Sequence, residues 1–313
     1  MSTDDFALNP ADYGLPTRRQ FQEMRIWDDH YHGLLLDGQD TDEGVDRMYA
    51  THDYTSTHRR MMTYVNRMGV ERLIALDVAG VRPGSSEMEV VPDRDAVLRR
   101  MLSTDEKDHL SGIIRIQPHV PEQSCEKMER WIRHGPCIGI KYMLGLCDHP
   151  NNDPIIRLAA ELDAVIYIHT WMKVGGEPRS FGGGTVGEEN TPMNVVNLSK
   201  RFPHVPLICG HSGGDWELAV PIVRAHPNIY FEFAGTDSHS GAVDFAVREL
   251  GADRITWGGH GPSRSFATEM SKVLDADLTA EQRRKIFGGN YRRLAEKAFR
   301  RKGQSMASRW GVA

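Results

Sequence analysis

Residues 24–32 read Met-Arg-Ile-Trp-Asp-Asp-His-Tyr-His, a short apolar run that leads into two histidines separated by one residue. We interpret residues 24–27 as a β-strand, with His30 and His32 just beyond its carboxyl end. Because side chains alternate between the two faces of an extended chain, residues two apart point to the same side. The two imidazoles are therefore expected to face a common point, a geometry that suits Zn²⁺ or a similar divalent ion.

Further apolar, β-rich runs follow along the chain, with helix-like stretches between them. These runs cover residues 72–78, 112–117, 138–143, 164–168, 205–209, 229–233 and 255–257. We expect helices over residues 95–102, 155–162, 193–201 and 216–224, two of which begin where a proline follows a capping residue. Strands alternating with helices over about 270 residues predict an α/β fold, a (β/α)8 TIM barrel, in preference to an open doubly wound sheet. No Gly-x-Gly-x-x-Gly follows the first strand, which counts against a dinucleotide-binding fold.

The composition sets limits on domains and partners. With 313 residues, of which 40% are hydrophobic, we expect one barrel domain at 25–300, an N-terminal extension at 1–24 and a C-terminal tail at 301–313. A net charge of -5 gives no general reason to bind nucleic acid. No signal-peptide pattern and no membrane-length apolar stretch occurs, and the 4 cysteines form no CxxC pair, so we expect a cytoplasmic protein without a membrane partner.

Two segments have the character of active-site loops. Residues 34–57 are polar and rich in aspartate, and residues 173–190 contain two glycine clusters. Each follows a predicted strand, at the end of the barrel where enzymes with this fold carry out their chemistry. We expect both segments to border the active site.

Two more histidines directly follow predicted strands: His169 ends the run AVIYI, and His211 follows VPLIC and a glycine. A single histidine in such a place is more often buried and structural than catalytic. Three strands that end in histidine are harder to explain in that way. If the barrel closes, their carboxyl ends meet, and these side chains converge although they lie far apart in sequence.

Several segments together resemble those of a known family, and they occur in its order along nearly the whole chain. They are DDHYH at 28–32, GIK at 139–141, IHTW at 168–171, RFPHVPLICGHSGG at 201–214, NIYFEFAG at 228–235 and IFGGNYRRL at 286–294. The chain thus resembles the amidohydrolase superfamily, in particular the branch that groups aminocarboxymuconate-semialdehyde decarboxylase with related metal-dependent hydrolases and decarboxylases.

This resemblance implies that His30, His32 and His169 bind a divalent metal, for which we expect zinc, and that His211 orients the substrate or the attacking water. The family usually has an aspartate after strand eight that ligates the metal and accepts a proton. Here residues 257–262 read WGGHGP, and the aligned residue is His260. An imidazole can serve as ligand or as general base. A metal enzyme that uses His260, a metal-free enzyme and a catalytically silent relative all remain open.

Other residues are candidates for supporting roles. Asp237, after the seventh strand, is a candidate replacement for the missing aspartate, although aspartate is also a common turn residue. Asp28 and Asp29 are expected to anchor the first strand or to orient a ligand imidazole. Cationic and aromatic side chains near strand ends suit a carboxylate-bearing substrate. The candidate substrate contacts are Trp171, Arg115, Tyr142 and Lys141, with Arg82 and Arg264 as further cations.

We therefore expect a hydrolase of a small-molecule ester, lactone, thioester or amide, with the carbonyl activated by a divalent metal or by the histidines. His211 and His260 are the expected catalytic residues for proton transfer. The alternatives are a non-oxidative decarboxylase of an unsaturated or aromatic carboxylate and a non-catalytic relative that binds a small molecule. Family members often form dimers, so a homodimer is expected. The substrate does not follow from the sequence, because barrel loops set specificity.

Overall fold

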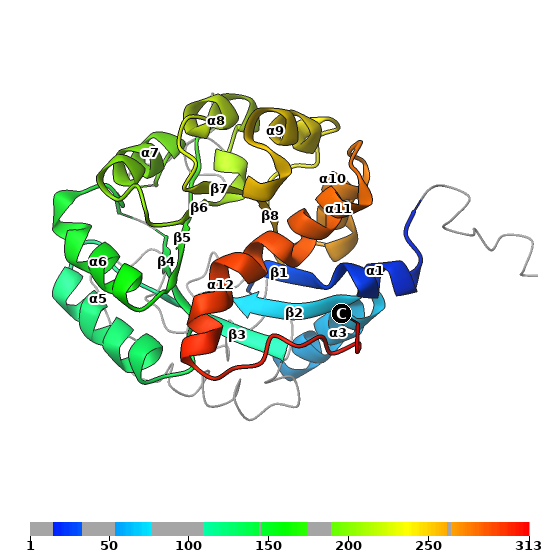
Figure 1. Ribbon diagram of the computed structural model, residues 1–313, viewed down its shortest axis with the longest axis horizontal. Coiled ribbons are helices and arrows are strands. Elements are labelled where there is room, and N and C mark those ends of the chain that lie inside the picture. The colour runs from blue at the N-terminus through cyan, green and yellow to red at the C-terminus, as the bar shows by residue number, and fades with distance from the viewer. Residues whose placement is uncertain are drawn as a thin grey trace, which may run out of the picture.

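The structure is a computed structural model that describes residues 15–32, 54–76, 109–143, 145–173, 189–261 and 264–312. Eight parallel strands follow one another in sequence order around a barrel, with helices on the outside (Figure 1). The strands are β1 (Ile26–Tyr31), β2 (Val70–Ala75), β3 (Leu110–Arg115), β4 (Gly139–Tyr142), β5 (Val165–Ile168), β6 (Leu207–Cys209), β7 (Ile229–Phe233) and β8 (Ile255–Trp257). The predicted (β/α)8 TIM barrel is confirmed.

Helices begin close to where the sequence places them. The α-helices are α1 (Arg18–Met24), α3 (Tyr54–Arg67), α5 (Pro121–Met128), α6 (Asp153–Glu161), α7 (Pro192–Arg201), α8 (Trp216–Val223), α9 (Ala242–Leu250), α10 (Phe266–Leu274), α11 (Ala280–Arg284) and α12 (Asn290–Arg301). Short 3-10 and π turns are η4 (Glu129–Arg133), η5 (Pro150–Asn152), η6 (His211–Gly213), η7 (Ala252–Arg254) and η8 (Lys285–Gly289). A proline in the first turn starts α6 and α7, as predicted.

The two predicted active-site loops fall only partly within the described residues. The loop expected at 34–57 is shorter, because α3 already begins at Tyr54. Residues 33–53 and 174–188, which make up most of the two expected loops, lie outside the described residues, as do the helix expected at 95–102 and Arg82.

Among the described residues, no helix has the length and apolar character needed to cross a membrane.

The first strand is longer than predicted, and it contains His30 instead of ending before it. Between Asp28 and Tyr31 it takes three steps along the chain, while its partner β2 takes two, from Leu73 to Ala75. This β-bulge inserts one extra residue and turns the side chains locally. The polar residues of this strand are fully buried, a feature that hydrophobic patterning does not anticipate.

The barrel closes between its first and last strands. β8 lies beside β1, and just beyond β8 the peptide N–H of His32 donates to the carbonyl oxygen of Gly261 at 2.7 Å. The Asp28 carboxylate accepts the peptide N–H of Gly259 at 2.6 Å. These contacts bring the segment after β8, which carries His260, against the end of β1.

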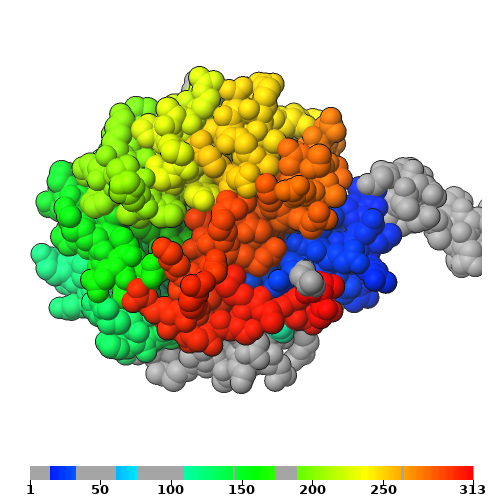
Figure 2. Space-filling view, viewed as in Figure 1, coloured from blue at the N-terminus to red at the C-terminus, as the bar shows by residue number. Residues whose placement is uncertain are grey.

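The amino-terminal end of the barrel, which we call the floor, is plugged by α12. Trp27 of β1 packs against Phe299 with ring centroids 5.4 Å apart, and the Arg72 guanidinium lies 5.0 Å from the centroid of each ring. Figures 1 and 2 show α12 crossing the centre of this face. The chain after α12 continues over the floor, where Ser308 donates to Glu71 at 2.8 Å. The opposite end, the mouth, is therefore where a substrate can reach the interior.

Candidate metal centre and active site

Five histidines from four parts of the barrel gather at the mouth, and we call them the histidine cluster: His30, His32, His169, His211 and His260. The ring centroid of His30 lies 4.4 Å from that of His260 and 4.7 Å from that of His211. The His169 ring lies 4.6 Å from the His211 ring. The predicted convergence of the strand-end histidines is confirmed.

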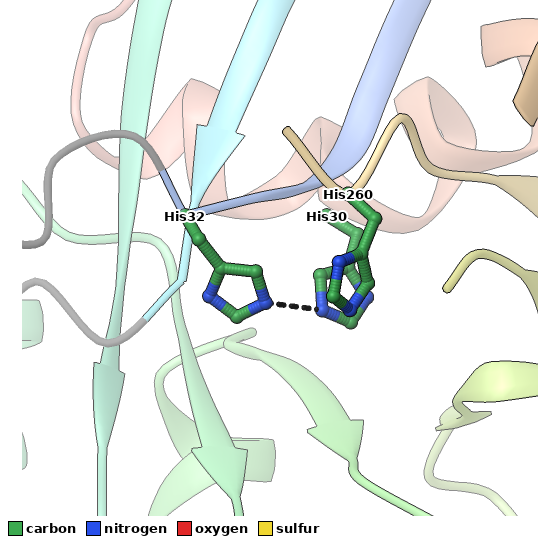
Figure 3. A group of neighbouring side chains, drawn as sticks. All are labelled: His30, His32 and His260. Atoms are coloured by element: carbon green, nitrogen blue, oxygen red, sulfur yellow. Dashed lines mark hydrogen bonds between the residues drawn. The ribbon is translucent and has the colours of Figure 1, made fainter. Parts of the chain in front are cut away.

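Three members of the cluster have the geometry of metal ligands. His30, His32 and His260 each offer a nitrogen atom, and these atoms lie within 4.8 Å of one another. Figure 3 shows the three rings turned toward a common point, with Nε2 of His30 and Nε2 of His32 at 2.9 Å. Two nitrogens bound to one ion at about 2.1 Å would lie about 3.0 Å apart at right angles and about 3.4 Å apart at the tetrahedral angle. The side chains therefore fit a divalent metal ion.

The protonation state of these rings also suits a metal. Burial lowers the pKa of His30, His211 and His260 well below the usual value, and neighbouring histidines lower it further. The positive charge of Lys141 acts in the same direction on all three rings. Neutral imidazole is the form that binds metal, so His30 and His260 are in their ligand form at neutral pH.

His169 takes a different place from the one expected for a ligand. Among the described residues, two groups of side chains could hold an ion, His30 with His32 and His260, and His30 with His211 and Glu232; His169 belongs to neither group. Its Nε2 lies 3.3 Å from a carboxylate oxygen of Glu189, and its ring lies 4.6 Å from that of His211. The structure thus gathers His30, His32 and His260 of the expected ligand set and leaves His169 beside His211.

His211 is held so that one ring nitrogen remains available for chemistry. Its Nδ1 lies 3.0 Å from the carbonyl oxygen of Ala234, which can only accept, so Nδ1 carries the proton. In the neutral ring, Nε2 therefore has its lone pair available as a base. The backbone of His211 has a φ of 55°, and that of His260 a φ of 50°. Such left-handed conformations are strained in residues other than glycine and are typical of functional sites.

Gly235 provides the room for these two rings. A Cβ atom at Gly235 would lie 2.7 Å from Nε2 of His260 and 2.9 Å from Nδ1 of His211, and its φ of 72° favours glycine. Its peptide N–H donates to the buried Glu269 at 3.2 Å. The loop after β7 is therefore fixed against the histidine cluster.

Glu232, in the middle of β7, is a site residue that the sequence analysis did not single out. Its carboxylate accepts from Nδ1 of His30 at 2.9 Å and from the peptide N–H of His211 at 2.7 Å. Tyr167 of β5 donates to it at 3.2 Å. Burial raises the pKa of Glu232 to about 8. The available signal was a lone carboxylate inside the apolar run IYFEF at 229–233.

The paired aspartates of β1 lie beneath the histidines, as expected of anchoring residues. Asp28 accepts the peptide N–H of His30 at 2.9 Å, which ties the bulge of β1 to the segment after β8. Burial raises the pKa of Asp28 to about 7. Asp29 is fully buried near Glu232, and burial raises its pKa as well. Both oxygens of Asp29 lack a hydrogen-bond partner among the described residues.

Comparison with known proteins identifies the family. Residues 72–295 match the family described as amidohydrolase. The chain belongs to this family. The matched residues include His169, His211 and His260, whereas His30 and His32 precede them. A search of curated proteins gave no match.

Solved structures with the same fold include several decarboxylases. The 5-carboxyvanillate decarboxylase of Sphingomonas paucimobilis is 14% identical with a TM-score of 0.65, over 87% of this chain and 99% of that one. The 2,6-dihydroxybenzoate decarboxylase of Rhizobium is 15% identical with a TM-score of 0.63, over 87% and 98%. A dihydroxybenzoic acid decarboxylase of Polaromonas, solved with manganese and 2-nitroresorcinol, is 14% identical with a TM-score of 0.61, over 87% and 96%. At this identity, the likeness establishes the fold.

Two of the residues predicted to contact substrate, Lys141 and Trp171, lie near the histidine cluster of this amidohydrolase. Arg115 and Lys141 are register partners on β3 and β4, so their side chains lie on the same face of the sheet. Lys141 is fully buried, with Nζ 5.6 Å from the centroid of Tyr167. Trp171 lies 6.1 Å from the His211 ring. Arg264 donates to the carbonyl oxygen of Gly235 at 3.0 Å.

Two expectations are corrected by the structure. Tyr142 is fully buried and belongs to the core between the barrel and its helices, with Cys147 and Ile155. It follows Lys141 on β4, so alternation turns it away from the barrel interior and from any substrate there. Asp237 is exposed and belongs to neither group of potential ligands, so it does not replace the missing aspartate. The turn role that we also considered for Asp237 fits its place after β7.

Proposed function

We propose that this amidohydrolase is a metal-dependent, non-oxidative decarboxylase of an aromatic or unsaturated small-molecule carboxylate. The observation that carries the proposal is the positive charge of the mouth. Lys141 is buried beside neutral histidines, and its charge lowers the pKa of three of them. Arg115 is its neighbour on β3. Cationic side chains at this place suit a substrate that carries a carboxylate.

The structural neighbours support the same reaction. Three of them are named as decarboxylases of aromatic acids, and the one from Polaromonas was solved with manganese. We therefore take the reaction class from this comparison together with the charge of the mouth.

His30, His32 and His260 would hold the divalent ion. When bound, the ion would bind and polarise oxygen atoms of the substrate. An all-imidazole ligand set suits zinc, while the neighbour named above contains manganese. Zinc remains our proposal on the chemistry of the ligands, and metal analysis of the purified protein decides between the two ions.

The remaining residues would bind the substrate and move one proton. Lys141 and Arg115 would hold anionic oxygens, and Trp171 would pack against an aromatic ring. Loss of CO2 breaks a carbon–carbon bond and leaves its electron pair on the ring carbon, which must then gain a proton. His211 has Nε2 available to take a proton from a substrate hydroxyl and deliver it to that carbon.

The reaction is tested by incubating the protein with hydroxybenzoates and unsaturated dicarboxylates and measuring released CO2 and the decarboxylated product. In D2O, we expect one deuterium on the carbon that loses the carboxylate. His211→Asn should abolish turnover with the metal retained. His239→Asn is the matched control, because His239 is an exposed histidine outside the cluster.

Hydrolysis remains the second candidate, because the available Nε2 of His211 is also suited to removing a proton from water. Esters, lactones, thioesters and amides assayed in ¹⁸O-labelled water distinguish the two reactions. Incorporation of ¹⁸O into an acid product without CO2 release would replace decarboxylation by hydrolysis. Tight binding of these compounds with no turnover of either kind would support a non-catalytic binding protein.

A further inference from the structure

We infer that Glu232 is a positioning residue whose single carboxylate holds both the ring of the metal ligand His30 and the backbone of His211. Tyr167 supports that carboxylate from β5. The inference rests on the metal centre of the proposed function, but it does not depend on which reaction follows. It assigns a role to a buried acid that makes no contact with substrate in the proposed mechanism.

The hydrogen bonds of Glu232 carry the inference. Oε1 lies 2.9 Å from Nδ1 of His30, and Oε2 accepts the peptide N–H of His211 at 2.7 Å. The first bond joins β7 to β1, and the second joins β7 to the strained turn after β6. One rigid strand residue therefore fixes the distance between the proposed metal ligand and the proposed proton carrier.

Tyr167 completes the arrangement from a third strand. Its hydroxyl donates to Oε2 of Glu232 at 3.2 Å and lies 2.9 Å from Nδ1 of His30. The surrounding backbone leaves space for this contact only because it carries glycine. A Cβ atom at Gly210 would lie 2.1 Å from the Tyr167 hydroxyl, and one at Gly258 would lie 2.8 Å from Oε1 of Glu232.

The direction of these bonds sets the tautomer of His30. For Nε2 to bind an ion, the ring proton must sit on Nδ1, and there it can donate to Oε1 of Glu232. The opposite tautomer would place a proton on the nitrogen that faces His32 and the metal position. A carboxylate enforces the binding tautomer because, when ionised, it can only accept.

The decisive variant is Glu232→Gln, which keeps the shape and removes one acceptor. If the amide oxygen serves Tyr167 and His211, the amide NH2 must face Nδ1 of His30 and donate to it. The proton of His30 would then move to Nε2. We expect the dissociation constant for Zn²⁺, measured by competition with a chromophoric chelator, to rise about 10- to 100-fold.

The tautomer itself gives a second readout that needs no metal. In metal-free protein with ¹⁵N-labelled histidine, at a pH above the pKa of about 8 of Glu232, NMR should show His30 protonated on Nδ1 in the wild type and on Nε2 in Glu232→Gln. His30→Asn identifies the signal. Thermal unfolding of each variant verifies that it is folded. A merely structural role for Glu232 would change the unfolding temperature without exchanging the tautomer.

A tyrosine pair extends the test if Glu232→Gln does not fold. Tyr167→Phe should weaken Zn²⁺ binding about two- to tenfold, the range expected for one hydrogen bond. Tyr142→Phe is the matched control, since Tyr142 is equally buried on the neighbouring strand and its hydroxyl has no hydrogen-bond partner among the described residues. If Tyr167 acts through Glu232, Tyr167→Phe should have little further effect in the Glu232→Gln background.

The possible outcomes separate this inference from the proposed function. Wild-type zinc affinity in folded Glu232→Gln and Tyr167→Phe would overturn it, as would a wild-type His30 protonated on Nε2. If the wild type binds neither zinc nor manganese, the proposed metal centre fails, and the tautomer measurement alone decides whether Glu232 positions His30. Failure to release CO2 bears only on the proposed reaction.

Discussion

The floor and the mouth of the barrel differ in how their buried polar groups are accommodated. At the floor, aromatic rings of β1 and α12 pack around the Arg72 guanidinium, and polar groups such as Glu71 have partners from the C-terminal segment. At the mouth, neutral histidines crowd together above buried carboxylates, and His211 and His260 hold strained backbone conformations. The floor therefore stabilises the fold. The buried titratable groups and strained backbone of the mouth cost stability, and only ligand binding would offset that cost.

The largest expected effect separates activity from stability at the mouth. His30→Ala should remove bound metal and reduce turnover at least about 1000-fold, because the ring lies at the centre of the ligand group. The unfolding temperature of the metal-free protein should change little or rise. Elemental analysis and thermal unfolding check both statements, with His239→Ala as the control. If the His30→Ala protein kept stoichiometric metal, the proposed contrast between a ligand-binding mouth and a stabilising floor would be wrong.

The floor should respond in the reverse way. Phe299→Ala deletes a fully buried ring that contacts Trp27, and it should lower the free energy of unfolding by about 3–5 kcal/mol. Zinc affinity of the folded variant should stay within about twofold of wild type. Arg300→Ala, at an exposed position of the same helix, should cost at most about 1 kcal/mol. Denaturant unfolding measures both; equal effects of the two variants would argue against α12 as the plug.

The pH dependence of the metal-free protein sharpens the comparison further. Burial raises the pKa of Asp28 from the ordinary 3.8 to about 7 and that of Glu232 from 4.5 to about 8, so stability falls as pH rises from each ordinary value to the raised one and levels off above it. The histidines have lowered pKa values, so their contribution is lost as pH falls below about 6.5.

Between pH 6.5 and pH 8 the histidines are largely neutral in both states, so stability without metal should fall there, by up to about 1.4 kcal/mol per pH unit for Glu232, whereas the contribution of Asp28 ends near pH 7. Urea unfolding at a series of pH values measures this. In Glu232→Gln the decline on the alkaline side should be smaller. Stability that rises steadily from pH 6.5 to pH 8 would contradict the raised pKa values of the buried acids.

The smallest expected change concerns the residue after β8. His260→Asp should tighten metal binding about tenfold, because a carboxylate adds a negative charge to a site of imidazoles. Aspartate also tolerates the φ of 50° at this position. His260→Asn is the control, since it tolerates the same backbone without the charge. Competition titration with Zn²⁺ separates them; equal affinities would mean that the charge at this position does not limit binding.

Much of this arrangement could be predicted from the chain. The apolar runs identify all the strands, and a proline after a capping residue marks the start of α6 and α7. The spacing of His30 and His32 predicts that their rings lie together, and their Nε2 atoms are 2.9 Å apart. These features depend on neighbours a few residues away, so local sequence records them.

Other features could not be predicted, because they depend on which strands meet. Glu232 contacts His30 across 202 positions of sequence, and only closure of the barrel brings β7 to β1. The bulge in β1 turns Asp29 and His30 inward together, contrary to simple alternation. The assignment of Tyr142 as a substrate contact failed because Tyr142 was chosen for its place at the end of a strand. The face of the sheet on which its side chain lies was not considered.

By itself, the sequence determined a parallel α/β barrel with histidines at its strand ends, because period and turn chemistry are local properties. The tertiary structure decided that His260 joins His30 and His32, that His169 pairs with Glu189 beside His211, and that Glu232 supports the cluster from below. These choices follow from register and closure, which place a few side chains within bonding distance out of the many that the sequence alone would allow.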